Sequence, residues 1–276
     1  MTDQTIRFKD CGIYYLMYEN PLKETIVLLH PYASSGLIFD SLIIALKREY
    51  QLIIIDMPGH GKSGVTSSVT FEDMPEIIKV ILDKEDILKT HIIGISEGAI
   101  VGQGFGQVFP DRLLSLVAIS SFSIYHGSYK AVYGELRGTK FKHLFLWLFS
   151  FKRYKNYYIE KSSSTNSGKD KFEKTMKGFK RISILSKKGL KRFYKMGKQN
   201  KIYPTYVVCG EFDLDIIKDA SIQYEQKVPL STLEGYNNTR QVVFLDNPRL
   251  FNDHLITFLK SVSMIGEAYG RKHKKQ

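Results

Sequence analysis

The sequence is short of the features that mark exported or membrane-spanning proteins. Its 276 residues include only two cysteines, Cys11 and Cys209, without the spacing of a disulfide framework or a metal site. Strand-like runs flank both, so we expect two buried thiols. Residues 1–10 carry charges of both signs and no apolar stretch of signal-peptide length. Apolar runs such as residues 52–55 fall far short of the roughly 20 residues needed to span a bilayer. We therefore expect a cytoplasmic protein.

Positive charge is abundant but unevenly distributed. The formal net charge is +12, yet residues 124–201 alone hold 21 Lys and Arg against four acids, or +17. Residues 271–276 add four more basic side chains, and the remainder of the chain sums to −9. The excess positive charge therefore belongs to one internal segment and one tail.

Hydrophobic patterning divides the chain in the same places. Apolar, β-branched runs alternate with amphipathic segments of helical length up to Ser123, which is typical of a mostly parallel sheet covered by helices. The alternation then stops for nearly 80 residues rich in Lys, Tyr, Phe and Ser, and resumes near Thr205. We predict an α/β core from residues 1–123 and 202–270, a basic helical cap from residues 124–201, and a basic tail from residues 271–276.

The predicted elements follow this division. Strands are expected at residues 6–8, 14–18, 25–29, 52–55, 91–95, 113–119, 205–209 and 231–233. Helices are expected around residues 37–47, 71–82 and 98–109, after Asp215, and from Arg249 to about Val262.

One motif carries recognisable chemistry. Gly94-Ile95-Ser96-Glu97-Gly98 follows an apolar strand and precedes a helix, which is the context of a G-x-S-x-G nucleophile elbow. Glycines are needed there because the serine occupies a strained turn in which neighbouring side chains would collide with backbone. The turn holds the serine hydroxyl above the sheet edge.

Two further motifs stand in the matching places. His30-Pro31-Tyr32 ends the first buried strand, and Asp56-Met57-Pro58-Gly59-His60-Gly61 ends the second. With the elbow, they resemble the α/β-hydrolase family, specifically its single-domain members with a helical cap. The resemblance implies a mostly parallel, twisted sheet flanked by helices, with the cap inserted after the sixth strand. It implies no metal and no organic cofactor.

The resemblance also implies roles for individual residues. Ser96 matches the nucleophile, and the backbone N–H groups of Tyr32 and Glu97 match the oxyanion hole. Asp213 matches the acid that orients an imidazole, with Glu211 and Asp215 as nearby rivals.

The sequence departs from the family at the catalytic histidine. Relatives carry this histidine about seven residues before the Asn-Pro that opens the final helix, and Gln241 stands there in this chain. An amide has no titratable nitrogen near neutral pH, so it cannot accept the serine proton. Loss of a triad member in serine proteases costs on the order of 10⁴ to 10⁶ in turnover.

Another histidine would have to replace the missing base. His126 and His143 belong to the insert, which folds over the site in this family, and either is a candidate. His254 is expected to pack along the final helix. The others are expected to lie in structural turns, at the far end of a strand or in the tail; these are His30, His60, His91 and His273.

The insert admits several interpretations. Leu144, Phe145, Trp147, Leu148 and Phe149 either line the substrate pocket or bury the cap against the core. Its lysines form a solvated face, or they attract an anionic ligand or an anionic membrane surface. Nucleic-acid binding is disfavoured because no nucleic-acid-binding fold accompanies the charge.

Two functions therefore compete. One is hydrolysis of a small carboxylic ester, thioester or lactone by Ser96 with a weak or unconventional base. The other is a non-catalytic pseudo-hydrolase whose pocket binds a small ligand or a protein partner.

Overall fold

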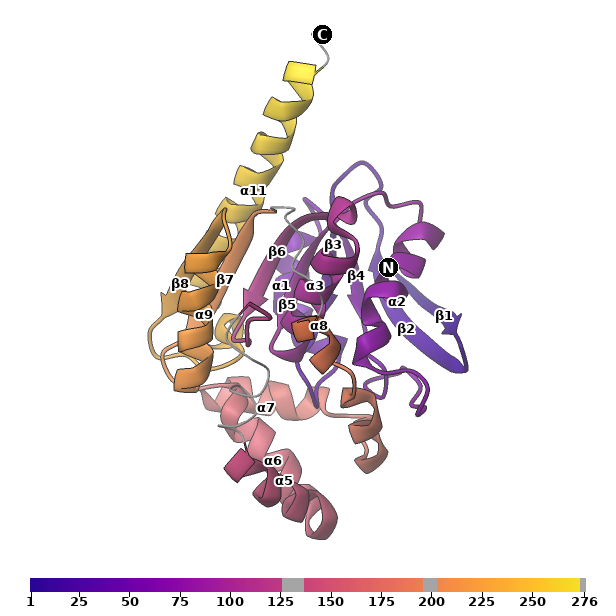
Figure 1. The fold of residues 1–276 in the computed structure, drawn as a ribbon, viewed down its shortest axis with the longest axis vertical. Helices are drawn as coiled ribbons and strands as arrows, with labels where there is room; N and C mark the ends of the chain where they lie inside the picture. Colours follow the sequence, from indigo (N-terminus) through magenta and orange to yellow (C-terminus); the bar gives the residue numbers. More distant parts are fainter. Residues whose placement is uncertain (126–136, 196–202, 274–276) are drawn as a thin grey trace.

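An eight-stranded sheet forms the centre of the protein (Figure 1). The computed structural model describes residues 1–125, 137–195 and 203–273. The strand order is β1-β2-β4-β3-β5-β6-β7-β8; β1 and β2 run antiparallel to their neighbours, and the strands from β4 to β8 pair in parallel. The strands are β1 (Thr2–Phe8), β2 (Cys11–Tyr18), β3 (Thr25–Leu29), β4 (Gln51–Ile55), β5 (Thr90–Ile95), β6 (Leu113–Ile119), β7 (Thr205–Gly210) and β8 (Ser231–Tyr236).

Burial explains which runs became central strands. Every residue of β3, β4 and β5 is buried, whereas β1 and β2 alternate between more and less buried positions. Strands covered on both faces require continuous apolar sequence, while an edge hairpin needs only one apolar face.

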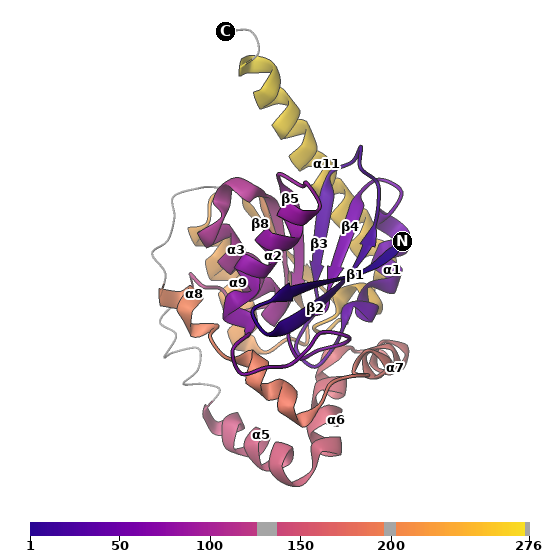
Figure 2. The ribbon, with the colours of Figure 1, turned by 90° about the vertical axis from the view of Figure 1, so that its right-hand side faces the viewer.

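Helices cover both faces of the sheet. Figure 2 shows α2, α3 and α9 on one side, with α1 and α11 on the other. Tight 3₁₀ turns precede α1 and α2, at Gly36–Phe39 and Phe71–Asp73. The covering helices are α1 (Asp40–Leu46), α2 (Met74–Lys84), α3 (Glu97–Val108), α9 (Asp215–Lys227), α10 (Val243–Asp246) and α11 (Pro248–His273).

A second group of helices lies between β6 and β7 in sequence and is here called the cap. Figure 1 shows α5, α6 and α7 together at one end of the molecule, opposite the free end of α11. Hydrogen bonds join this group to the core, with the Ser34 and Thr175 hydroxyls 2.7 Å apart. Its described elements are α5 (Arg137–Phe149), α6 (Phe151–Ser162), α7 (Asn166–Thr175), the 3₁₀ helix η4 (Arg181–Lys187) and α8 (Lys191–Lys195).

The fold expected from sequence is confirmed, with differences at element ends. The helix expected to end near Val262 continues to His273, so the predicted tail begins inside α11. No proline interrupts residues 263–273, and basic residues near a helix C-terminus are favourable. Cys11 is buried as expected, but Cys209 is only half-buried. The boundaries at 124 and 201 stay predictions, because residues 126–136 and 196–202 lie outside the described residues. Among the described helices, none combines the length and the apolar sequence that a bilayer-spanning helix needs.

Candidate active site

Ser96 sits in a strained turn at the carboxyl end of β5. Its backbone adopts φ +52° and ψ −114°, a conformation that a non-glycine residue adopts at a cost of order 1–3 kcal/mol. The Ser96 N–H donates to the Ile119 carbonyl on β6 at 2.8 Å, which fixes the turn against the sheet. Such strain is characteristic of a serine held clear of both strand and helix.

The two glycines of the motif leave no room for side chains. A Cβ on Gly94 would lie 2.5 Å from the Ala99 nitrogen, and one on Gly98 would lie 2.3 Å from the Leu29 carbonyl oxygen. Both contacts are with backbone, which cannot give way cheaply. The sequence therefore requires glycine at these positions for α3 to begin so close to β3 and β5.

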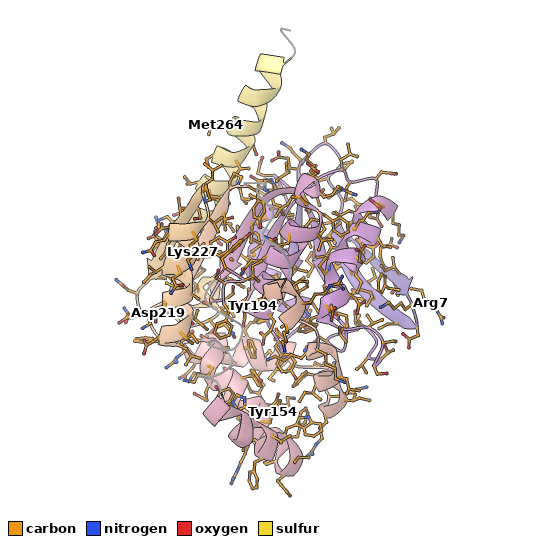
Figure 3. The ribbon with its side chains drawn as sticks, viewed as in Figure 1. Arg7, Tyr154, Tyr194, Asp219, Lys227 and Met264 are labelled. Carbon is orange, nitrogen blue, oxygen red and sulfur yellow. The ribbon has the colours of Figure 1, made fainter. Side chains whose placement is uncertain are left out.

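A cavity of about 370 Å³ opens beside Ser96. Core residues from the carboxyl ends of β5, β6, β7 and the loop after β8 form its floor, and residues of α5, α6 and η4 form its roof. Tyr154, labelled in Figure 3, belongs to this roof. In α/β sheets, ligands bind outside the carboxyl ends of the strands. A larger cavity of about 710 Å³ includes Thr25 and Gln51, at the amino ends of β3 and β4, so we assign the site to the smaller one.

Asp213 and Gln241 line the same cavity as Ser96. Asp213 follows β7, and its Oδ2 accepts a hydrogen bond from the Gly210 N–H at 2.8 Å. Burial raises the pKa of Asp213, against the opposing effects of the Ser120 hydroxyl and the Gly210 N–H. In the described residues, no direct hydrogen bond joins Gln241 to Ser96 or to Asp213. The three side chains thus share a cavity without forming a hydrogen-bonded triad.

The two alternative acids, Glu211 and Asp215, have partners away from the cavity. Glu211 Oε2 accepts from the Asn238 N–H at 2.7 Å, and Asp215 pairs with Lys218 at 2.8 Å on the surface. Neither lines the cavity of Ser96. This placement favours Asp213 as the acid.

The Glu97 side chain makes a contact that the sequence did not suggest. Its Oε2 accepts from the Ser96 hydroxyl at 2.8 Å and from the Tyr32 N–H at 3.4 Å. Its Oε1 lies 2.6 Å from the Lys187 ammonium of η4. Burial alone would raise the pKa of Glu97, but Lys187 and the Ser96 hydroxyl outweigh it and hold that pKa at about 2. The predicted oxyanion hole therefore has a carboxylate against one of its donors.

Comparison with known proteins agrees with the fold. The family model described as the alpha/beta hydrolase fold matches residues 24–248. The chain belongs to the α/β-hydrolase fold family. Among curated relatives, an uncharacterized hydrolase of Bacillus subtilis, YugF, is 24% identical over 264 residues, covering 90% of this chain and 94% of the relative.

Other relatives match part of the chain or its fold alone. A 2-hydroxy-6-oxononadienedioate/2-hydroxy-6-oxononatrienedioate hydrolase of Escherichia coli K12 is 36% identical over 118 residues, 41% of this chain and 38% of that protein. A thermophilic esterase from Thermogutta terrifontis superposes with a TM-score of 0.76 at 15% identity, covering 95% of this chain and 99% of that one. This last likeness, at such low identity, establishes the fold only.

The histidines of this α/β hydrolase differ in whether they lie at the cavity beside Ser96. His30 and His60 are fully buried and bonded to the Pro31 and Pro58 carbonyls, as expected for structural turns. His91 contacts Ser115 and Glu24, away from the cavity, and His254 contacts Tyr236. Among the histidines whose side chains are described, only His143 lines the cavity, with its ring 4.3 Å from that of Tyr157. His126 lies outside the described residues, as does the side chain of His273.

The five apolar residues of α5, expected either to line the pocket or to bury the cap against the core, divide between these roles and exposure. Leu144 lines the cavity, and Trp147 packs against the core. Phe145 and Phe149 are 61% and 71% exposed, and Leu148 is 47% exposed. Trp147 turns inward and donates its indole N–H to the Arg181 carbonyl at 3.0 Å. The outer face of α5 is therefore apolar and exposed, which helical spacing alone did not reveal.

Lys187 is the functional candidate that sequence reasoning missed. It stands among the 21 basic residues of the insert, and nothing in the pattern separates it from the others.

No group of three or more His, Cys, Asp or Glu side chains within the described residues is placed to hold a metal ion.

Proposed function

We propose that this α/β hydrolase cleaves a small carboxylic ester, thioester or lactone through Ser96, with a weak base in place of the family's histidine. The observation that carries the proposal is the strained turn of Ser96, which opens into a cavity shared with Asp213 and Gln241. A strained serine between two obligatory glycines is costly, and such strain clusters at functional sites, which favours a role for the hydroxyl. Relatives named as hydrolases support the reaction class.

The proposed reaction has two steps. Ser96 Oγ attacks the carbonyl carbon, its proton passes to a base, and the oxyanion accepts hydrogen bonds from the Tyr32 and Glu97 N–H groups. Collapse breaks the bond to the leaving group, which takes up the proton, and leaves an acyl-serine. Water then attacks the acyl carbon, releasing the acid and restoring the Ser96 hydroxyl.

The base in this scheme is weak. Gln241 cannot take a proton, and a Glu97 carboxyl whose pKa is about 2 is poorly matched to general-base catalysis near neutral pH. His143 is the described imidazole that lines the cavity, and we assign the base role to it, acting through a bound water. Replacement of His143 by Gln should then lower turnover further.

Specific observations favour a second function, a non-catalytic pocket that binds a small ligand or partner. Gln241 has replaced the base, and the Glu97 carboxylate lies against the Tyr32 N–H where a substrate oxygen should bind. Hydrolysis of p-nitrophenyl butyrate separates the two functions. The hydrolase proposal expects wild-type turnover well above that of Ser96→Ala, whereas equal rates for the two folded proteins would leave the pocket as a binding site.

We also infer that the cap meets an anionic ligand or an anionic membrane surface in the cytoplasm. Lys152 and Arg153 are exposed at the start of α6, and in the described chain no carboxylate pairs with either. They follow directly on the exposed apolar face of α5, formed by Phe145, Leu148 and Phe149. Adjacent cationic and apolar side chains are the combination that binds anionic lipid interfaces.

A further inference from the structure

Three hydrogen-bond donors from three separate segments converge on the Glu97 carboxylate. The Ser96 hydroxyl comes from the elbow, the Tyr32 N–H from the loop after β3, and the Lys187 ammonium from the cap, at 2.8, 3.4 and 2.6 Å. The Glu97 side chain is only 14% exposed. A carboxylate held this way in a buried place is fully satisfied, and the donors around it form a cradle for one anionic group.

The cradle coincides with the reacting position. Tyr32 N–H is a predicted oxyanion donor and Ser96 Oγ is the predicted nucleophile, so a ligand oxygen that reaches both must take the place of Glu97 Oε2. Two carboxylates cannot share this position, because like charges at contact distance repel strongly in a poorly hydrated site. Entry of an anionic group therefore requires Glu97 to leave the cradle.

The cavity gives such a group a way in. Lys187 lines the cavity and its side chain remains 34% exposed, so a ligand in the cavity reaches the same ammonium that Glu97 now holds. Burial alone would lower the pKa of Lys187, but Glu97 raises it, so the ammonium is charged at neutral pH. Lys161 also lines the cavity, and no carboxylate of the described residues pairs with it.

The remaining walls select the body of the ligand. Phe122, Leu144, Ile184 and Leu214 contribute apolar surface, next to the rings of Tyr154 and Tyr157. A cavity with cations at one side and apolar walls elsewhere suits a molecule with one anionic head and an apolar body.

We propose that Ser96, Tyr32 and Lys187 form a carboxylate-binding cradle. The Glu97 side chain fills it in this structure, and the carboxylate of an aliphatic or aromatic acid fills it by displacing Glu97. Lys187 anchors the exchange, because its ammonium serves either carboxylate in turn. The cradle does not depend on turnover. In a hydrolase it holds the acid product of an ester, and in a binding protein it holds the ligand itself.

Calorimetric titration with hexanoate tests the exchange, with hexanamide as the uncharged probe. In Glu97→Gln the internal anion is gone while size is kept, and hexanoate should bind at least about tenfold tighter than to the wild type. Glu97→Ala, which empties the cradle, should show the same gain. Adding Lys187→Met to either variant should abolish the gain, and hexanamide should bind all proteins alike. Glu72→Gln is the matched control, since Glu72 pairs with cap residue Arg192 at 3.1 Å but does not line the cavity.

The outcomes separate this inference from the proposed function. Unchanged hexanoate affinity in both folded Glu97 variants would overturn it, as would a gain that survives Lys187→Met or that hexanamide shares. Because calorimetry needs no turnover, a protein without esterase activity that shows the expected exchange would support the cradle and contradict only the hydrolase proposal. A protein with esterase activity but without the exchange would support the hydrolase proposal and contradict the cradle.

Discussion

The core and the cap contribute different things to one cavity. The core places Ser96 after the fully buried strand β5, and it places Asp213 and Gln241 in the loops that follow β7 and β8. The cap places Lys161 and Lys187 over them and carries most of the positive charge, +17 against −9 for the remainder without the tail. The core therefore contributes the candidate catalytic residues of the cavity, whereas the cap contributes its lysines. Each part can therefore be altered separately.

The largest expected effect is a gain in esterase turnover when the missing histidine is restored in the core. Gln241→His should place an imidazole in the cavity with Ser96 and Asp213, where it accepts the serine proton and is oriented by the carboxylate. Hydrolysis of p-nitrophenyl butyrate should rise by at least about 10², the low end for a positioned general base. Steady-state rates of the purified variant provide the measurement.

A double variant controls for adventitious imidazole chemistry. The gain should vanish in Gln241→His combined with Ser96→Ala, whose imidazole is present without the nucleophile. A folded Gln241→His protein that gains no Ser96-dependent turnover would show that the core does not hold triad geometry.

The next effect is a loss of folding stability when the ion pair between Glu97 of the core and Lys187 of the cap is broken. The pKa of Glu97 is lowered from 4.5 to about 2 in the folded protein, so the carboxylate stabilises the fold fully above about pH 4.5. This stability should be lost as pH falls through about 2, and it is worth up to about 3 kcal/mol. Urea unfolding of wild type and Glu97→Gln should differ at pH 7 and converge toward pH 2. The exposed pair of Glu72 should show a much smaller difference in Glu72→Gln. Equal unfolding free energies at pH 7 for wild type and Glu97→Gln would contradict a stabilising role for the Glu97 carboxylate.

The smallest effect concerns the outer surface of the cap. Binding to vesicles containing phosphatidylserine should be detectable by sedimentation at low salt. It should weaken as the Debye length falls from about 30 Å at 0.01 M to about 8 Å at 0.15 M. Lys152→Glu with Arg153→Glu should lower binding several-fold, at about 1 kcal/mol per basic residue near the surface.

Matched charge reversal on the core tests whether position matters. Lys47 is exposed just after α1, so Lys47→Glu should leave vesicle binding nearly unchanged. Equal binding to neutral and anionic vesicles at every salt concentration would return the cap lysines to the role of a solvated face.

The core was predictable from sequence because its signals are local. Continuous apolar runs specify buried strands, and Gly94 and Gly98 reveal a turn in which backbone would meet any side chain. Gln241 was located through the resemblance, because relatives carry their histidine about seven residues before the Asn-Pro that opens the final helix. The roles of Ser96, Asp213 and Gln241 follow from the resemblance to the family, and the three side chains line one cavity.

The cap was less predictable because its contacts are long-range. Which face of α5 turns inward depends on how the helix docks, so Phe145 and Phe149, expected in the pocket or against the core, lie exposed instead. Lys187 meets Glu97 across 90 residues of chain, and no periodicity encodes that distance. The Glu97 side chain was overlooked because the elbow motif assigns a role only to its backbone.

Labelling by a fluorophosphonate probe tests the central claim, that Ser96 is a nucleophile in an incomplete triad, most directly. Mass spectrometry of the wild-type protein should find the probe on Ser96, at a slow rate that increases in Gln241→His, and no label at this site in Ser96→Ala. Folded wild-type protein that acquires no more label than Ser96→Ala over the same period would contradict the claim.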